Sequence, residues 1–259
     1  MIARNILLPA AILMTATTGF AAERSLLDDA SLGKDRYDRC LALIKRNPGT
    51  AIDQANGWAK EGGGAAALHC DALALVELKR YAEAAEKLEE AVHNSAVKAA
   101  GERAALLDQA GNAWLLAGKP DKANAAFSAS LTAVPQDEDV LVDRARARGL
   151  LKDWSGADAD LSAVLSLDSD RADALVLRAS ARHALGRTAE ASADVARALE
   201  LYPDYPEALL ERGNIKFESG DLSGARADWQ QVITDAPGTD SAAAAEVRIE
   251  SLTSRPAPH

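Results

Sequence analysis

The sequence predicts an all-α protein, a solenoid in which helical hairpins are stacked one after another. Three observations lead to this fold class. Alanine supplies much of the 48% hydrophobic content while aromatic residues make up only 4%, a composition that favours helices. Small, apolar and turn-forming residues recur every 34 residues, which is a sufficient length for two helices and their turns. Glycines and prolines fall between the apolar segments, where helices are expected to end.

Five recurring columns define the units. They hold a leucine (Leu107, Leu141, Leu175, Leu209), a small residue (Gly111, Ala145, Ala179, Gly213), an alanine (Ala123, Ala157, Ala191, Ala225), a bulky residue (Phe127, Leu161, Val195, Trp229) and a turn residue (Pro135, Ser169, Pro203, Pro237). An earlier copy lies 39 residues upstream, with Leu68, Ala72, Ala84 and Leu88. Gly118, Gly186 and Gly220 separate the paired helices. The small columns predict close helix approach, and the bulky columns fill the space beside it.

This pattern resembles the tetratricopeptide repeat family in its length and in its alternation of small and large residues. The resemblance covers Ala65 to Pro237, with Ser169 in place of one closing proline and Lys152 in place of one inter-helix glycine. It implies a right-handed α-α solenoid, a TPR-like array in which the first helix of each unit lines an inner, concave surface. It also implies a role as a non-enzymatic scaffold that binds a peptide or a partner protein in that groove.

The chain is expected to divide into five parts. Residues 1–21 are predicted to be a signal peptide, 22–64 a degenerate helical pair with a linker, 65–238 five repeats, 239–253 a capping helix and 254–259 a tail. The signal peptide is predicted from Arg4, the apolar run "ILLPAAILMTAT" and the small residues Gly19 and Ala21. The run is shorter than the roughly 20 residues that span a bilayer. We therefore expect export to the periplasm with no stable membrane insertion after processing; an uncleaved anchor is the alternative.

The charge balance argues against a general nucleic-acid binder. There are 39 acidic and 29 basic residues, and the net charge is -10. The sequence contains no nucleophile–base pair, phosphate-binding loop or metal-ligand spacing, so we expect no enzymatic activity, no cofactor and no metal. Two alternatives remain: an enzyme or enzyme accessory domain with thiol chemistry around Cys40, Trp58, His69 and Cys70, or a structural assembly subunit that self-associates through its ends.

The two cysteines are predicted to form a disulfide. Cys40 and Cys70 are the only cysteines of a chain that we expect to reach an oxidising compartment, and they fall on first helices of neighbouring hairpins. Free buried thiols, a reactive thiol and a metal ligand are the alternatives. A triad within His69, Cys70 and Asp71 is excluded, because successive helix residues point about 100° apart.

The stretch "VDRARARG" contains three arginines, and the repeat divides them by role. Arg144, Arg178 and Arg212 are 34 residues apart, and Asp160, Asp194 and Asp228 follow each of them by sixteen residues. In the first unit the same positions hold Asp71 and Lys87, and in the second Ala110 and Ala126. Because every unit keeps the two positions neutral in sum, we predict structural ion pairs across the hairpin. Arg148 lies on the same side of its helix as Arg144.

Five residues are candidate groove contacts. Arg146 shares a column with Asn112, Ser180 and Asn214, and the family resemblance implies that this column faces the groove. His183 and Phe217 would add a titratable ring and an apolar contact; solvated surface is the alternative for each of the five. Family members that clamp a terminal carboxylate carry a lysine four residues before the asparagine, where this chain has Asp108 and Leu210. Trp114, Trp154 and Trp229 are predicted to be core, and Trp58 has no assigned place.

Overall fold

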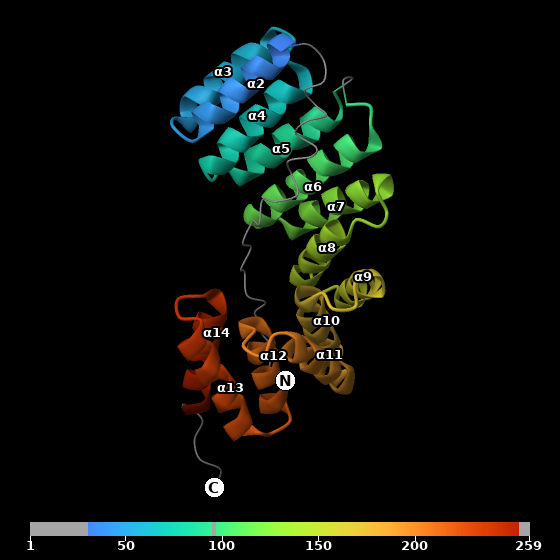
Figure 1. Ribbon diagram of the computed structural model, residues 1–259, viewed down its shortest axis with the longest axis vertical. Helices are drawn as coiled ribbons and strands as arrows, with labels where there is room; N and C mark the ends of the chain where they lie inside the picture. The colour runs from blue at the N-terminus through green and yellow to red at the C-terminus, as the bar shows by residue number, and fades with distance from the viewer. Residues whose placement is uncertain (1–30, 95–96, 254–259) are drawn as a thin grey trace. The chain divides into compact units, whose positions relative to one another are not determined.

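A computed structural model describes residues 31–94 and 97–253, and every regular element in these ranges is a helix. The predicted all-α fold is confirmed. The predicted signal peptide (1–21) and tail (254–259) lie outside the described residues. The chain divides into two compact units, which within the described residues are 31–147 and 148–253. In each unit, antiparallel helical hairpins stack on one another (Figure 1).

The unit of residues 31–147 begins with a hairpin that precedes the repeats. This unit contains α2 (Ser31–Ile44), α3 (Pro48–Lys60), α4 (Gly64–Glu77), α5 (Tyr81–Val92), α6 (Ala100–Leu116), α7 (Pro120–Ala133) and most of α8 (Glu138–Leu150). Helix α3 packs on α4, α5 packs on α6, and α2 also contacts α4. The degenerate pair is therefore one more layer of the stack.

The unit of residues 148–253 continues the same arrangement and ends in a single helix. It contains α9 (Trp154–Leu167), α10 (Ala172–Ala184), α11 (Thr188–Leu201), α12 (Pro206–Glu218), α13 (Leu222–Asp235) and α14 (Asp240–Thr253). Helix α14 packs on both α12 and α13, and it buries Ala242 and Ala245. It therefore covers a face of the last hairpin that would otherwise be open.

The turn inside each repeat hairpin has one residue in the left-handed region. Gly118, Gly186 and Gly220 have φ values of 67°, 78° and 91°. Lys79 and Lys152 occupy the same place in their hairpins, with φ values of 58° and 62°. The turn geometry is thus kept where lysine replaces glycine, although a side chain is disfavoured in this conformation.

The small and bulky columns meet inside the hairpins. Phe127 and Trp229 are fully buried, and a Cβ atom added to Gly111 or Gly213 would overlap the respective ring. Where the bulky residue is smaller, as with Val195 or Leu88, the partner column holds Ala179 or Ala72. The core therefore matches the size of the two columns hairpin by hairpin.

No helix within the described residues has both the length and the apolar character needed to cross a membrane.

Candidate functional site

Polar side chains from α6 and α8 form a cluster on the first-helix face, the face where first helices of successive hairpins meet. Asn112 donates from Nδ2 to Asp108 Oδ1 at 3.2 Å and also hydrogen-bonds Asp143. Arg146 donates from Nη1 to Asp143 Oδ1 at 2.5 Å. All four side chains are half-buried. The predicted groove contacts Asn112 and Arg146 thus lie in one cluster together with two carboxylates.

The carboxylates of this cluster have perturbed acidity. Burial raises the pKa of Asp108 to about 7, and the negative charges of Asp143, Asp137 and Asp139 raise it further. Burial also raises the pKa of Asp143, while Arg146 and Asn112 act in the opposite direction. A positively charged or hydrogen-bond-donating ligand would relieve this concentration of acid.

A second cluster on the first-helix face joins α10 to α12. His183 lies with Nδ1 2.8 Å from Glu211 Oε1 and Nε2 3.3 Å from Glu218 Oε2. Asn214 donates to Glu211 Oε2 at 3.2 Å. Burial lowers the pKa of His183, but the hydrogen bond and charge of Glu211, with Glu218, outweigh burial and raise it. The protonated ring therefore bridges two carboxylates.

The structure corrects the expected role of His183. Only 4% of the residue is exposed, so it is not open to a ligand in the way the repeat column predicts. It is covered because the next first helix carries Glu211 at hydrogen-bonding distance, a contact between helices rather than within the repeat. Phe217 is half-buried, and its ring centroid lies 5.7 Å from that of Trp229, so it packs against the hairpin core.

Two of the predicted ion pairs are brought together with bidentate geometry. Arg178 donates from Nε and Nη2 to the carboxylate of Asp194 at 2.9 and 2.7 Å. Arg212 does the same to Asp228 at 3.0 and 2.7 Å. Both aspartates are buried. Arg144 donates to the hydroxyl of Ser128 at 3.3 Å, as Arg178 does to Ser162 at 3.3 Å.

A second column of cations was missed by the sequence reasoning. Arg148 reaches Asp160 at 2.7 Å, Arg182 reaches Asp194 at 2.8 Å and Lys216 reaches Asp228 at 2.8 Å. These three cations are also 34 residues apart, four residues after the predicted arginine column. The recurrence was therefore present in the sequence, and it shows that each buried aspartate is a junction and not one half of an isolated pair.

The predicted pair of Asp71 and Lys87 is wrong in its geometry. Lys87 donates to Glu90 Oε2 at 2.8 Å, one turn along its own helix, and the buried Oδ1 atom of Asp71 accepts no hydrogen bond. Burial raises the pKa of Asp71, and the charges of Lys87 and Arg80 offset this in part. A flexible lysine takes the nearer, more exposed carboxylate, because that contact requires less desolvation.

Cys40 on α2 and Cys70 on α4 are joined by a disulfide, with their Cα atoms 6.3 Å apart. The bond links the degenerate hairpin to the first repeat. Since these are the two cysteines of the chain, no free thiol remains in the structure to act as a nucleophile.

His69 lies beside this disulfide in a fully hydrogen-bonded, buried position. Its Nδ1 is 2.6 Å from the hydroxyl of Tyr37, and its Nε2 is 2.7 Å from Oε1 of Gln109. Burial lowers the pKa of His69. The neutral ring, accepting from Tyr37 and donating to Gln109, satisfies both contacts and ties α2, α4 and α6 together. Its role is therefore structural.

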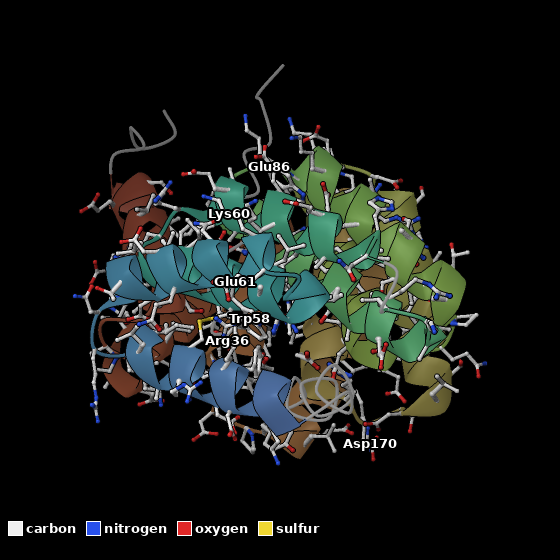
Figure 2. The ribbon with its side chains drawn as sticks, turned by 90° about the horizontal axis from the view of Figure 1, so that it is seen from above. Arg36, Trp58, Lys60, Glu61, Glu86 and Asp170 are labelled. Carbon is white, nitrogen blue, oxygen red and sulfur yellow. A yellow bond between two sulfur atoms is a disulfide. The ribbon has the colours of Figure 1, made fainter. Side chains whose placement is uncertain are left out.

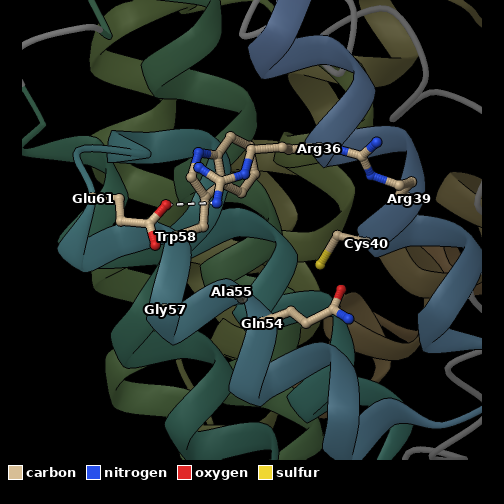
Figure 3. A pocket seen from close by; sticks show the side chains of 8 residues that line it. All are labelled: Arg36, Arg39, Cys40, Gln54, Ala55, Gly57, Trp58 and Glu61. Atoms are coloured by element: carbon tan, nitrogen blue, oxygen red, sulfur yellow. Dashed lines mark hydrogen bonds and ion pairs between the residues drawn. The ribbon is translucent and has the colours of Figure 1, made fainter.

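Trp58, which the sequence left without a place, lines a cavity between α2 and α3. The guanidinium of Arg36 lies 5.9 Å from the centre of the Trp58 ring and donates to Glu61 at 2.6 Å (Figure 2). Arg39 and Gln54 also line this cavity of about 300 Å³ (Figure 3). Of the tryptophans predicted to be core, Trp114 and Trp229 are buried and Trp154 is half-buried. The described residues contain no group of three or more potential metal ligands.

The repeat geometry agrees with a family comparison. The sequence model of the tetratricopeptide repeat matches residues 207–239, which include α12 and α13. The chain is a tetratricopeptide-repeat protein. No curated protein matches its sequence.

Solved tetratricopeptide-repeat structures share this fold at low sequence identity. A tetratricopeptide repeat protein from Parabacteroides merdae is 16% identical, with a TM-score of 0.73 over 85% of this chain and 86% of that one. MamA from Desulfovibrio magneticus is 18% identical, with a TM-score of 0.58 over 66% of this chain and 93% of that one. YrrB, described as having an unusual peptide-binding site, is 16% identical, with a TM-score of 0.56 over 75% and 96%.

Proposed function

We propose that this chain is a non-enzymatic scaffold that binds a peptide or a partner protein on its first-helix face. The observation that carries the proposal is the cluster of Asp108, Asn112, Asp143 and Arg146. These half-buried groups come from neighbouring first helices and lie apart from the hairpin cores. Such an array offers acceptors and donors at fixed positions to an extended segment.

The acid of this cluster points to the chemistry of the partner. Asp108 and Asp143 carry raised pKa values because burial and mutual repulsion disfavour their charges. A partner segment that presents a lysine, an arginine or backbone N–H groups would compensate them. The described peptide-binding site of the structural neighbour YrrB is in keeping with a peptide-binding role for this fold.

The proposal is tested by cross-linked capture with the full chain as bait. The double variant Asn112→Ala with Arg146→Glu should lose the captured partner. Ala129→Glu, on the exposed side of α7, should retain it and serves as the control of equal fold. Equal capture by the wild-type chain and both variants would show that the first-helix cluster is not the binding surface.

We also propose that the protein works after export, with residues 1–21 removed and the Cys40–Cys70 bond formed in an oxidising compartment. N-terminal sequencing of protein from the periplasmic fraction tests this, with a mature start near Ala22 or Glu23 expected. An intact Met1 in soluble exported protein would contradict the cleavage.

A further inference from the structure

The groove between α9 and α10 shows how a repeat closes off its own cations. Asp158 on α9 accepts from Arg182 Nε at 2.8 Å and from Arg187 Nη1 at 2.6 Å. Ser162, one turn further along α9, accepts from Arg178 Nη1 at 3.3 Å. The cations on α10 thus have acceptors on the preceding helix in addition to Asp194.

The groove between α11 and α12 is the next copy of this groove, and it lacks those acceptors. The positions of Asp158 and Ser162 are taken by Ser192 and Ala196. The hydroxyl of Ser192 donates to the carbonyl of Thr188 on its own helix at 2.9 Å, and Ala196 has no polar side-chain atom. Arg212 and Lys216, the counterparts of Arg178 and Arg182, bind Asp228 on the following helix.

The loss of the acceptors opens a cavity and exposes the cations. The side chains of Arg212 and Lys216 are 40% and 32% exposed, against 16% and 14% for Arg178 and Arg182. Both cations line a cavity of about 510 Å³ between α11 and α12. Its walls include the apolar side chains of Val195, Leu199 and Ile215. The groove therefore combines cationic donors with an apolar wall.

Two native carboxylates lie near these cations, and both are already engaged. Glu200 lines the same cavity but accepts from Arg197 at 3.0 Å. Asp221 stands where the preceding repeat has Arg187, and its carboxylate caps α13 by accepting from the N–H of Gly224 at 2.9 Å. Neither carboxylate takes the place that Asp158 occupies in the preceding groove.

We propose that the α11–α12 groove binds a carboxylate of a partner segment, held by Arg212 and Lys216 in the position that Asp158 fills one repeat earlier. An acidic residue with apolar neighbours matches both the cations and the wall. This site is distinct from the first-helix face, and it rests on the proposed function in that the carboxylate belongs to a bound peptide or protein.

The test uses the full chain and three short probes. These are acetyl-Ala-Leu-Glu-Leu-amide, the same peptide with Gln for Glu, and acetyl-Ala-Leu-Leu with a free carboxyl terminus. Binding is followed by NMR of the arginine Nε–H signals, with Arg212 assigned by Arg212→Lys. We expect the Glu peptide to bind about tenfold more tightly than the Gln peptide. Binding of the free-terminus probe instead would assign the carboxylate to a chain end.

The decisive variant restores the internal carboxylate. Ser192→Asp, at an exposed position, should weaken the Glu peptide about tenfold and leave the melting temperature equal or higher. The reverse change, Asp158→Ser, should create a second carboxylate site on Arg182. Equal binding of the Glu and Gln peptides, or unchanged binding by Ser192→Asp, would overturn the proposal. Since these probes need no natural partner, failure here is distinct from failure of the capture experiment.

Discussion

Arg178 and Asp194 form a bidentate ion pair between α10 and α11, and Arg182 adds a second cation to the same carboxylate at 2.8 Å. The aspartate is 5% exposed, so its removal would leave two arginines without their buried partner. We expect Asp194→Ala to lower the free energy of unfolding by about 3 kcal/mol. Arg178→Ala should lower it less, because Arg182 still compensates Asp194. Denaturant melts measure both changes.

The double variant Arg178→Ala with Asp194→Ala should recover part of the loss, as Ala110 and Ala126 occupy the same positions in another hairpin. A coupling of about 0.5 kcal/mol or more is expected from the mutant cycle. Strict additivity would mean that the hydrogen bonds seen between these residues do not contribute to stability.

The second prediction concerns the small and bulky columns. In Gly111→Ala the new methyl group overlaps the ring of Phe127, and we expect a loss of about 1–3 kcal/mol from overpacking. Phe127→Leu in the same chain makes room and reproduces the Ala72 and Leu88 combination of the first repeat. The double variant should therefore be more stable than the sum of the single losses predicts. Additive losses in thermal melts would contradict the size matching.

The third prediction concerns the lysine in the α8–α9 turn. Lys152 has a φ of 62°, a conformation disfavoured by about 1–2 kcal/mol for residues with a side chain. Lys152→Gly removes this strain but adds freedom to the unfolded chain, so a gain of about 0.5–1 kcal/mol is expected. The matched control, Gly186→Ala at the same turn position, should lose about 1–2 kcal/mol. A destabilised Lys152→Gly variant would show that the lysine side chain stabilises the turn.

These predictions also mark how far the sequence alone leads. The Arg178–Asp194 contact was predictable because both charges recur with the repeat, and so was the size matching of Gly111 and Phe127. The role of Arg182 was equally encoded but needed a second column to be read. The burial of His183 was not encoded in the period, because Glu211 reaches it from the next hairpin. Lys87 shows the remaining limit: its long side chain chooses between Asp71 and Glu90 by local desolvation.

The fourth prediction is a pH dependence set by Asp108. Its pKa is about 7 in the folded protein, against 3.8 for an unperturbed aspartate. A raised pKa means that the folded state holds the proton more tightly, so the stabilisation is complete below about pH 4 and is lost as the pH rises through 7. Asp108→Asn removes this titration. We expect it to reduce the loss of stability between pH 5 and pH 8 by about 1–3 kcal/mol, given the half-buried side chain.

Denaturant melts at pH 5 and pH 8 measure this difference. Asp139→Asn is the control, since Asp139 is exposed and acts on Asp108 only through its charge. An Asp108→Asn variant with the pH profile of the wild type would mean that this carboxyl titrates at its ordinary pKa.

The last prediction concerns the disulfide between Cys40 and Cys70, which lie 30 residues apart in sequence. Closing a loop of this length stabilises the fold by about 3–4 kcal/mol in the chain-entropy model. The link holds α2 on α4, where the degenerate hairpin has no hairpin before it within the described residues. The double variant Cys40→Ser with Cys70→Ser should therefore loosen α2 and α3 first.

Hydrogen exchange resolves this effect along the chain. Amides of α2 and α3 should lose protection in the double serine variant, while those of α10 to α13 keep theirs, because each hairpin contacts only its neighbours. The buried contact of His69 with Tyr37 also crosses from α4 to α2, so Tyr37→Phe should weaken the same hairpin in the oxidised protein, but less. A uniform loss of protection from α2 to α14 would mean that the disulfide supports one cooperative unit, and the first hairpin would then be no more separable than any later repeat.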